Sequence, residues 1–235
     1  MIPQIDRYRA VIFDFDQTLV NSSLGMDTGL ERVSPACYKL IKPGTLSSEG
    51  LTSYLRTLAE RMDRSCVYDR NIWWEKCLAK FAGQKPDKRL LDYLTNTYWE
   101  SVMERTLAYN DTFDALGYLR GHGYQVGIVS DTDGIRSMKR RRIATVGLDS
   151  YMDTIVVAGE DTIELKPDPK PFLLACKMLD VTPDKSIFVG DKPLTDTKGA
   201  RRAGMSTIFL RRNRRHTHVK ATTTINQLNE LKSIL

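Results

Sequence analysis

Two aspartates and a threonine occur at every second position directly after an apolar run near the start of the chain. Residues 11–13 are β-branched and aromatic, which is typical of a buried strand in a parallel sheet. Asp14, Asp16 and Thr18 follow, and side chains two residues apart leave an extended chain on the same side, about 6.5 Å apart. Burying two carboxylates together costs several kcal/mol each unless a cation or hydrogen-bond donors compensate. The spacing therefore favours a chemical role for this strand end.

Polar residues also follow three later segments that have the character of strands. Ser130 and Asp131 end one apolar run, Lys166 follows the next, and Asp191 and Asp196 come after a third. In an open parallel sheet, ligands bind outside the carboxyl ends of the strands. We therefore expect three or more carboxylates, a hydroxyl and a lysine to meet in one pocket with the first strand end.

This set of side chains suits a divalent cation and a phosphate. Hard oxygen ligands select Mg²⁺, which takes one or two protein carboxylates together with substrate phosphate. Lys166 and the Ser130 hydroxyl could hold the phosphoryl oxygens. One carboxylate can attack phosphorus and form an aspartyl-phosphate. A second carboxylate two residues on could protonate the leaving alcohol and later activate water, provided that its like-charged neighbour raises its pKa.

Taken in order, these motifs resemble those of the haloacid dehalogenase superfamily, in particular its phosphoglycolate-phosphatase-like branch with a helical C1-type cap. The matching motifs are Asp14-Phe-Asp16-Gln-Thr18, Ile-Val-Ser130, Lys166-Pro and Gly190-Asp191-Lys-Pro-Leu-Thr-Asp196. The resemblance of the core covers residues 7–23 and 107–210. It implies a phosphoric monoester hydrolase that depends on Mg²⁺.

The resemblance also implies a role for each motif residue. Asp14 would be the nucleophile and Asp16 the general acid/base. The expected phosphate-binding residues are Thr18, Ser130, Asp131 and Lys166. The expected metal ligands are Asp14, the backbone carbonyl of Asp16 and Asp191, with Asp196 supporting them or replacing one.

Some positions leave alternatives open. Lys170 lies close enough in sequence to replace Lys166, and a serine or aspartate at a strand end, such as Ser130 or Asp131, often caps the following helix. Gln17 stands where this branch usually has glycine, and Asp131 stands where asparagine is common. The presence of a second motif aspartate argues against dehalogenation, because a halide needs no proton to leave.

The rest of the chain must position these residues. Residues 18–29 are rich in Asn, Ser, Asp and Gly and predict a loop. Apolar residues then recur at helical spacing within residues 51–62, 74–81 and 91–102, with breaks at residues 42–45 and 82–86. We expect an all-helical cap domain over residues 24–106, in which Trp73, Trp74 and Trp99 belong to the core.

From residue 110 the pattern alternates between helices and short apolar strands, which indicates βαβ units. Predicted helices cover residues 111–121, 135–146, 169–179, 198–203 and 224–235. Predicted strands cover residues 9–14, 124–129, 154–158, 186–189 and 207–210. The expected fold is a Rossmann-like, three-layer α/β core with a parallel five-stranded sheet, built from residues 1–23 and 107–235.

Charge and cysteine content indicate which partners and which cellular compartment to expect. The 235 residues carry a formal net charge of +6, concentrated in basic runs at residues 139–142, 198–202 and 211–220. We interpret each run as a solvated face or loop, and His216 and His218 as loop residues that lack a third metal ligand. The four cysteines form no CxxC pair, which fits a reducing cytosol. The sequence contains no run of 18 uncharged apolar residues that would predict a membrane span. We expect an unexported, cytoplasmic protein.

The leading hypothesis is a Mg²⁺-dependent phosphatase of a small phosphorylated metabolite resembling phosphoglycolate or a sugar phosphate. One alternative is a sugar phosphomutase of the same fold, which needs a cap that keeps water from the aspartyl-phosphate. An alternative of another class is a nucleic-acid-associated basic protein that uses residues 211–220, although no recognised nucleic-acid motif supports it. The sequence does not identify the substrate or the oligomeric state.

Overall fold

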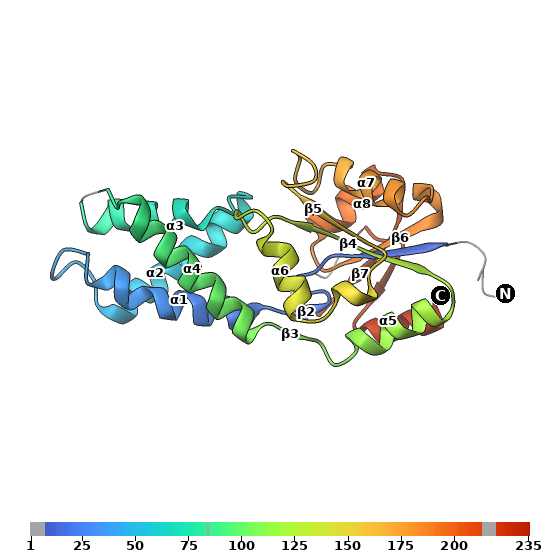
Figure 1. Cartoon of the computed structure of the whole chain (residues 1–235), viewed down its shortest axis with the longest axis horizontal. Helices are drawn as coiled ribbons and strands as arrows, with labels where there is room; N and C mark the ends of the chain where they lie inside the picture. Colours follow the sequence, from blue (N-terminus) through green and yellow to red (C-terminus); the bar gives the residue numbers. More distant parts are fainter. Residues whose placement is uncertain (1–7, 84, 213–219) are drawn as a thin grey trace. The chain divides into compact units, whose positions relative to one another are not determined.

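The computed structural model describes residues 8–83, 85–212 and 220–235, and the chain divides into two compact units (Figure 1). The α/β unit consists of Met1–Asn21, Leu107–Thr132 and Arg136–Leu235. The helical unit consists of Ser22–Thr106 and Asp133–Ile135. Within the described part of the chain, no helix is long and apolar enough to cross a membrane.

The α/β unit is built on a six-stranded sheet in the order β5-β4-β1-β6-β7-β8, and all neighbouring strands are parallel. The strands are β1 (Ala10–Phe13), β4 (Gln125–Asp131), β5 (Thr154–Ala158), β6 (Ser186–Gly190), β7 (Ser206–Leu210) and β8 (Thr223–Ile225). Phe13 at the end of β1 lies opposite Ile128 of β4 and Val189 of β6. The carboxyl ends of β4 and β6 therefore flank the residues that follow β1.

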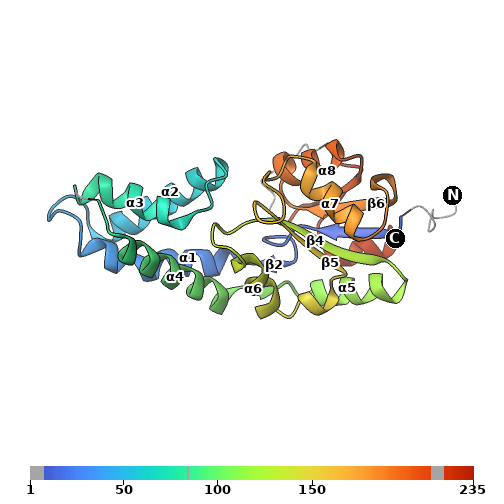
Figure 2. The same ribbon diagram turned by 45° about the horizontal axis from the view of Figure 1, so that its top comes forward.

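Helices cover both faces of this sheet, as Figures 1 and 2 show for α5 on one side and α7 and α8 on the other. The helices are α5 (Thr112–Gly121), α6 (Met138–Thr145), α7 (Lys170–Met178) and α8 (Lys198–Arg202), with shorter turns at η1 (Asp149–Tyr151), η2 (Pro183–Lys185), η3 (Pro193–Thr197) and η4 (Leu228–Ser233). Side chains of β1 alternate between the two faces. Phe13 packs in one core cluster with Leu116 of α5, and Ile12 packs in the other with Phe172 of α7.

The α/β class and the three-layer arrangement predicted from the sequence are confirmed, and all five predicted strands are present. The predicted closing helix over residues 224–235 is wrong. Its first residues instead form a sixth strand, β8, in which Ile225 pairs with Leu210, and only the short η4 follows. The β-branched run Thr222–Ile225 explains the strand, because such side chains pack well on a pleated surface.

Four helices make up the helical unit: α1 (Ser23–Tyr38), α2 (Ser48–Arg64), α3 (Arg70–Phe81) and α4 (Lys88–Arg105). The loop predicted over residues 18–29 is wrong from residue 23 onward, because α1 begins there. The glycines that suggested a loop instead let α1 approach α4. A Cβ at Gly25 would lie 2.7 Å from the carbonyl oxygen of Val102, and one at Gly29 would lie 2.7 Å from the Tyr98 ring.

Aromatic side chains fill the centre of the helical unit, as predicted. Trp73, Trp74 and Trp99 are each at most 1% exposed. The buried guanidinium of Arg70 lies 3.6 Å from the centroid of the Trp73 ring and donates a hydrogen bond to the Tyr68 carbonyl. These contacts compensate the burial of its charge.

Two short antiparallel strands, β2 (Val20–Asn21) and β3 (Leu107–Ala108), lie where the chain leaves the α/β unit and returns to it. A buried ion pair fixes the segment beside them. Arg212 donates two hydrogen bonds to the Asp111 carboxylate, at 2.8 and 3.0 Å, and one to the Thr18 carbonyl. Asp111 also accepts from the backbone N–H of Leu228.

Most of the basic stretch at residues 211–220, including His216 and His218, lies outside the described residues. Within the described part, Arg212 is in the buried pair with Asp111 rather than on a solvated face.

We expect the Arg212→Met substitution to lower the free energy of unfolding by about 3 kcal/mol, because it leaves the Asp111 carboxylate buried without its cation. Urea unfolding followed by circular dichroism measures this loss. The control is Lys232→Met, which breaks the exposed pair of Lys232 with Asp114 and should cost less than about 1 kcal/mol. Equal losses for the two variants would contradict the role given to burial.

Candidate active site

Three carboxylates converge beyond the carboxyl ends of β1 and β6. Asp14 directly follows β1, Asp191 directly follows β6, and Asp196 belongs to η3. One oxygen from each lies within 4.8 Å of the other two. Asp14 Oδ2 and Asp191 Oδ1 are buried and receive no hydrogen bond from any described residue. Oxygen-only donors with unused lone pairs are what Mg²⁺ requires, so these residues fit a divalent cation.

The turn after β6 returns Asp196 to the cluster. Pro193–Thr197 form a single π-helical turn, and the backbone N–H of Lys192 donates to Asp196 Oδ2 at 2.9 Å. The close approach depends on Gly190, where a Cβ would lie 2.5 Å from Asp196 Oδ2. The glycine of the fourth motif is therefore required by packing against the carboxylate that it helps to place.

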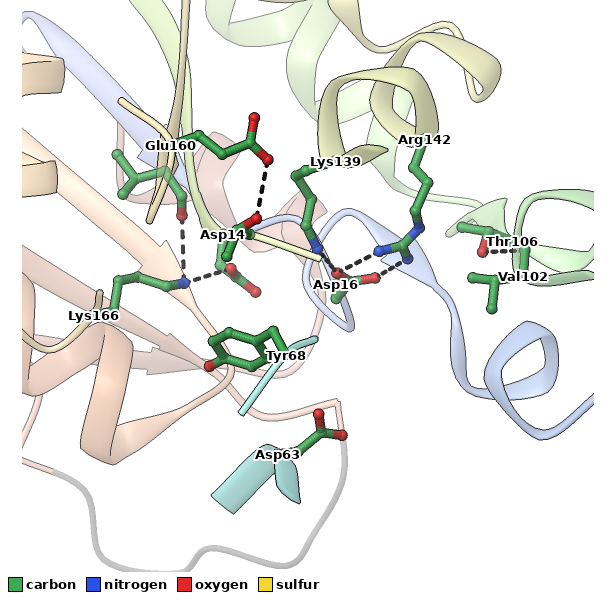
Figure 3. A network of polar contacts seen from close by, with 12 residues as sticks. Asp14, Asp16, Asp63, Tyr68, Val102, Thr106, Lys139, Arg142, Glu160 and Lys166 are labelled. Atoms are coloured by element: carbon green, nitrogen blue, oxygen red, sulfur yellow. Dashed lines mark hydrogen bonds and ion pairs between the residues drawn. The ribbon is translucent and has the colours of Figure 1, made fainter. Parts of the chain in front are cut away.

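A buried lysine joins two of the carboxylates. Lys166 Nζ lies 2.6 Å from Asp14 Oδ1 and 2.8 Å from Asp196 Oδ1, and Figure 3 shows it pointing toward Asp14. Burial alone would lower the pKa of Lys166, but Asp14 and Asp196 outweigh burial and raise that pKa well above its usual value. Lys170, the rival considered above, pairs with Glu164 at the surface. The structure thus brings Lys166, and not Lys170, to Asp14.

The residues predicted to bind phosphate lie around the same strand ends. Asp131 accepts a hydrogen bond from the backbone N–H of Lys166 at 2.9 Å, so it holds the segment that carries the lysine. Ser130 is buried in β4. Thr18 is fully buried, and its Oγ1 has no hydrogen-bond partner among the described residues. Direct phosphate binding by Thr18, Ser130 and Asp131 stays a prediction.

Burial and the crowding of negative charge shift the pKa values of the acids in this cluster. Burial raises the pKa of Asp14, and Asp196 adds to the shift, although Lys166 opposes it. Burial, Asp196 and Asp14 together raise the pKa of Asp191 to about 8. Each shift reflects the difficulty of holding buried like charges together, which a bound cation would relieve.

Asp16 has a different environment. Lys139 Nζ donates to Asp16 Oδ2 at 2.5 Å, Arg142 Nη1 donates to the same oxygen at 3.2 Å, and Arg142 Nη2 donates to Oδ1 (Figure 3). Burial raises the pKa of Asp16, but Arg142 and Lys139 outweigh burial and hold that pKa well below its usual range. The predicted raised pKa of the second motif aspartate is therefore wrong. The like-charge effect falls on Asp14 and Asp191 instead.

Lys139 and Arg142 are the site residues that sequence reasoning missed. The basic run at residues 139–142 was expected to be a solvated face, yet both of these side chains are buried, whereas Arg140 is partly exposed and Arg141 is exposed. Their spacing of three residues within a predicted helix was the available signal, since residues i and i+3 share a helix face. Which face of the helix turns inward depends on tertiary packing.

The carboxylate of Glu160 fixes the start of α6. Glu160 Oε1 accepts a hydrogen bond from Thr132 Oγ1 at 3.0 Å, and its Oε2 accepts one from the backbone N–H of Ser137 at 2.9 Å. Ser137 has a left-handed φ of 65°, so α6 begins at Met138 rather than at residue 135 as predicted. Glu160 thereby helps to fix the start of the helix that carries Lys139 and Arg142.

The chain belongs to the haloacid dehalogenase-like hydrolase family, which matches residues 11–210. The predicted superfamily is therefore confirmed.

Individual relatives are similar over most of the chain. A glyceraldehyde 3-phosphate phosphatase from Methanopyrus kandleri is 28% identical over 206 residues, which cover 88% of this chain and 85% of the relative. A phosphoglycolate phosphatase from Salmonella paratyphi A is 28% identical over 218 residues, with 88% and 82% covered. The crystal structure of a HAD phosphatase from Thermococcus onnurineus superimposes with a TM-score of 0.71 at 28% identity, covering 96% of this chain and 97% of that one.

We expect Mg²⁺ to raise the melting temperature of the protein, and to do so more at pH 8 than at pH 5. The usual pKa of Asp191 is 3.8 and the folded value is about 8, so the folded, metal-free protein holds a proton that the unfolded chain has released. The stability contributed by this proton is present at low pH and is lost as pH rises toward 8. At pH 8 fewer protons compete with Mg²⁺ for the carboxylates of the cluster.

Differential scanning fluorimetry with and without MgCl₂ measures the shift in melting temperature. Asp191→Asn should remove most of the Mg²⁺-dependent shift, whereas the exposed control Asp149→Asn should keep it. A full shift in Asp191→Asn would show that Mg²⁺ binds elsewhere.

Proposed function

We propose that this protein is a Mg²⁺-dependent phosphatase of a small phosphorylated metabolite and that it works through an aspartyl-phosphate on Asp14. One observation carries the proposal. Asp14 has one oxygen held by the buried Lys166, and its other oxygen is buried and unbonded beside Asp191 and Asp196. The phosphatase names of the relatives described above support this choice of reaction.

The metal-holding residues of the proposal are Asp14, Asp191, Asp196 and the backbone carbonyl of Asp16. A bound Mg²⁺ would neutralise the carboxylates and polarise the phosphoryl group. The chain supplies the remaining parts. Lys166 would donate to a phosphoryl oxygen, as would the Ser130 and Thr18 hydroxyls.

In the first step, an oxygen of the Asp14 carboxylate attacks phosphorus and the bond from phosphorus to the leaving oxygen breaks. The small protonated fraction of Asp16, which Lys139 and Arg142 keep low in the free protein, gives its proton to that oxygen, so an alcohol leaves and Asp16 becomes a carboxylate. The product on the protein is a mixed anhydride between the Asp14 carboxyl group and phosphate.

In the second step, water attacks phosphorus and passes a proton to the Asp16 carboxylate. The bond between phosphorus and the Asp14 oxygen breaks, which releases inorganic phosphate and restores the Asp14 carboxylate. The sum of the two steps is hydrolysis of a phosphate monoester by one water molecule. The carboxylate form of Asp16 that Lys139 and Arg142 favour is the form required for this second step.

In this proposal, residues 24–106 act as the cap that selects the substrate, and residues 1–23 and 107–235 form the catalytic core. The family resemblance supports that division of roles. The four cysteines are free, which supports a reducing compartment such as the cytoplasm. No observation on the described residues favours the phosphomutase or the nucleic-acid alternative over hydrolysis.

We expect Asp14→Asn to reduce turnover on the order of a thousandfold or more, because the amide cannot serve as the nucleophile. Phosphate release is measured with Mg²⁺ over a panel of phosphorylated metabolites that includes phosphoglycolate, glyceraldehyde 3-phosphate and sugar phosphates. Circular dichroism checks that the variant is folded, and Asp149→Asn serves as the matched exposed control.

Retention of full activity by folded Asp14→Asn would overturn the assignment of the nucleophile. Conversion of a sugar 1-phosphate into a 6-phosphate without free phosphate would identify a phosphomutase instead.

A further inference from the structure

Two buried cationic side chains of α6 donate hydrogen bonds to Asp16, the residue expected to transfer protons. Lys139 and Arg142 are 4% and 0% exposed as side chains, and together they donate to both oxygens of Asp16. Because the residues lie three apart on one helix, their side chains share a face. We call Lys139 and Arg142 the α6 clamp.

The α6 clamp restricts where the Asp16 carboxylate can lie. A carboxylate on a lone aspartate side chain can rotate about two bonds, whereas hydrogen bonds to both of its oxygens fix its plane as well as its position. Asp16 follows β1 by three residues and lies in no helix or longer strand. The clamp therefore supplies an orientation that the local backbone does not.

Contacts other than those with Asp16 also anchor α6. Ile143 of this helix is fully buried in the core cluster that also contains Phe13, and Met138 is buried as well. Glu160 holds the backbone N–H of Ser137 at the start of the helix. Since other contacts already fix α6, the ion pairs act to place Asp16 rather than to attach the helix.

We propose that Lys139 and Arg142 are positioning residues that hold the Asp16 carboxyl group at the point where it exchanges a proton with the leaving group and with water. This proposal rests on the proposed phosphatase function and extends it to two residues of α6. The clamp itself touches Asp16 and does not need to touch the substrate.

The consequence is a dependence on the leaving group. An alkoxide leaves phosphorus only with the help of a proton, whereas a nitrophenolate leaves without one. Misplacing Asp16 should therefore slow the hydrolysis of alkyl phosphates far more than that of p-nitrophenyl phosphate. A loss of folded protein would instead slow both substrates by the same factor.

The test compares Arg142→Met with Arg141→Met, a change at the exposed neighbouring residue on the same helix. For Arg142→Met we expect kcat/KM to fall about tenfold or more for the best alkyl phosphate of the metabolite panel, and less than about threefold for p-nitrophenyl phosphate. Arg141→Met should leave both values unchanged. The conservative variants Arg142→Lys and Lys139→Arg should retain part of the selectivity, because each still donates to Asp16.

A double-mutant cycle covers the case in which Arg142→Met folds poorly. Asp16→Asn should show the same loss of alkyl-phosphate selectivity, and adding Arg142→Lys to it should change the ratio of the two substrates no further. Equal losses on both substrates for Arg142→Lys, or faster turnover of alkyl phosphates, would overturn the proposal. If the parent protein hydrolyses neither substrate, the proposed function fails. If the parent is active and both Arg142→Met and Arg142→Lys match Arg141→Met on both substrates, only the role of the clamp fails.

Discussion

The buried ammonium group of Lys166 is the interaction on which the rest of the site depends. Its Nζ bridges Asp14 and Asp196, and all three side chains are at most 4% exposed. Two carboxylates in such a place repel each other by about 4 kcal/mol at 4 Å and an effective dielectric constant of about 20. The lysine converts that repulsion into two attractions, because it lies within hydrogen-bond distance of both. Without Lys166, protonation or another cation would have to neutralise the cluster, and a protonated Asp14 could not serve as the proposed nucleophile.

Lys166 can reach that position because of the order of the strands in the sheet. Lys166 follows β5, and β4 lies between β5 and β1, so the lysine must extend past β4 to meet Asp14. The Asp131 carboxylate accepts a hydrogen bond from the backbone N–H of Lys166, and Lys166 Nζ lies 3.4 Å from the Val129 carbonyl of β4. A parallel arrangement with β1 at the centre is what makes this reach short enough for a lysine side chain.

The sequence was sufficient to predict five of the six strands of the main sheet and the acidic cluster, because both follow from local rules. Apolar runs predict buried strands, and the carboxyl ends of parallel strands meet at one edge. The failures have a different cause. Gly25 and Gly29 have the composition of a loop, yet they lie within α1 because α4 packs against them. Lys139 and Arg142 are part of a basic run, yet the packing of Ile143 turns them inward. Contacts between distant segments decide these cases, and no window of the sequence contains both partners.

The same reasoning explains why two aspartates separated by one residue differ so much. Asp14 is still held to the sheet, since its backbone N–H donates to the Val189 carbonyl of β6, and its side chain meets the acids that follow β6. Asp16 has left the sheet, and its side chain meets two cations of α6. Burial acts on both, but the neighbours have opposite charge, so the pKa of Asp14 rises and that of Asp16 falls. Spacing along the strand therefore specifies where carboxylates gather, whereas the elements on either side of the strand decide which carboxylate is held ionised. The proposed mechanism needs both conditions, because the carboxylates proposed to hold the metal must accept positive charge, whereas Asp16 must be presented to water as a base.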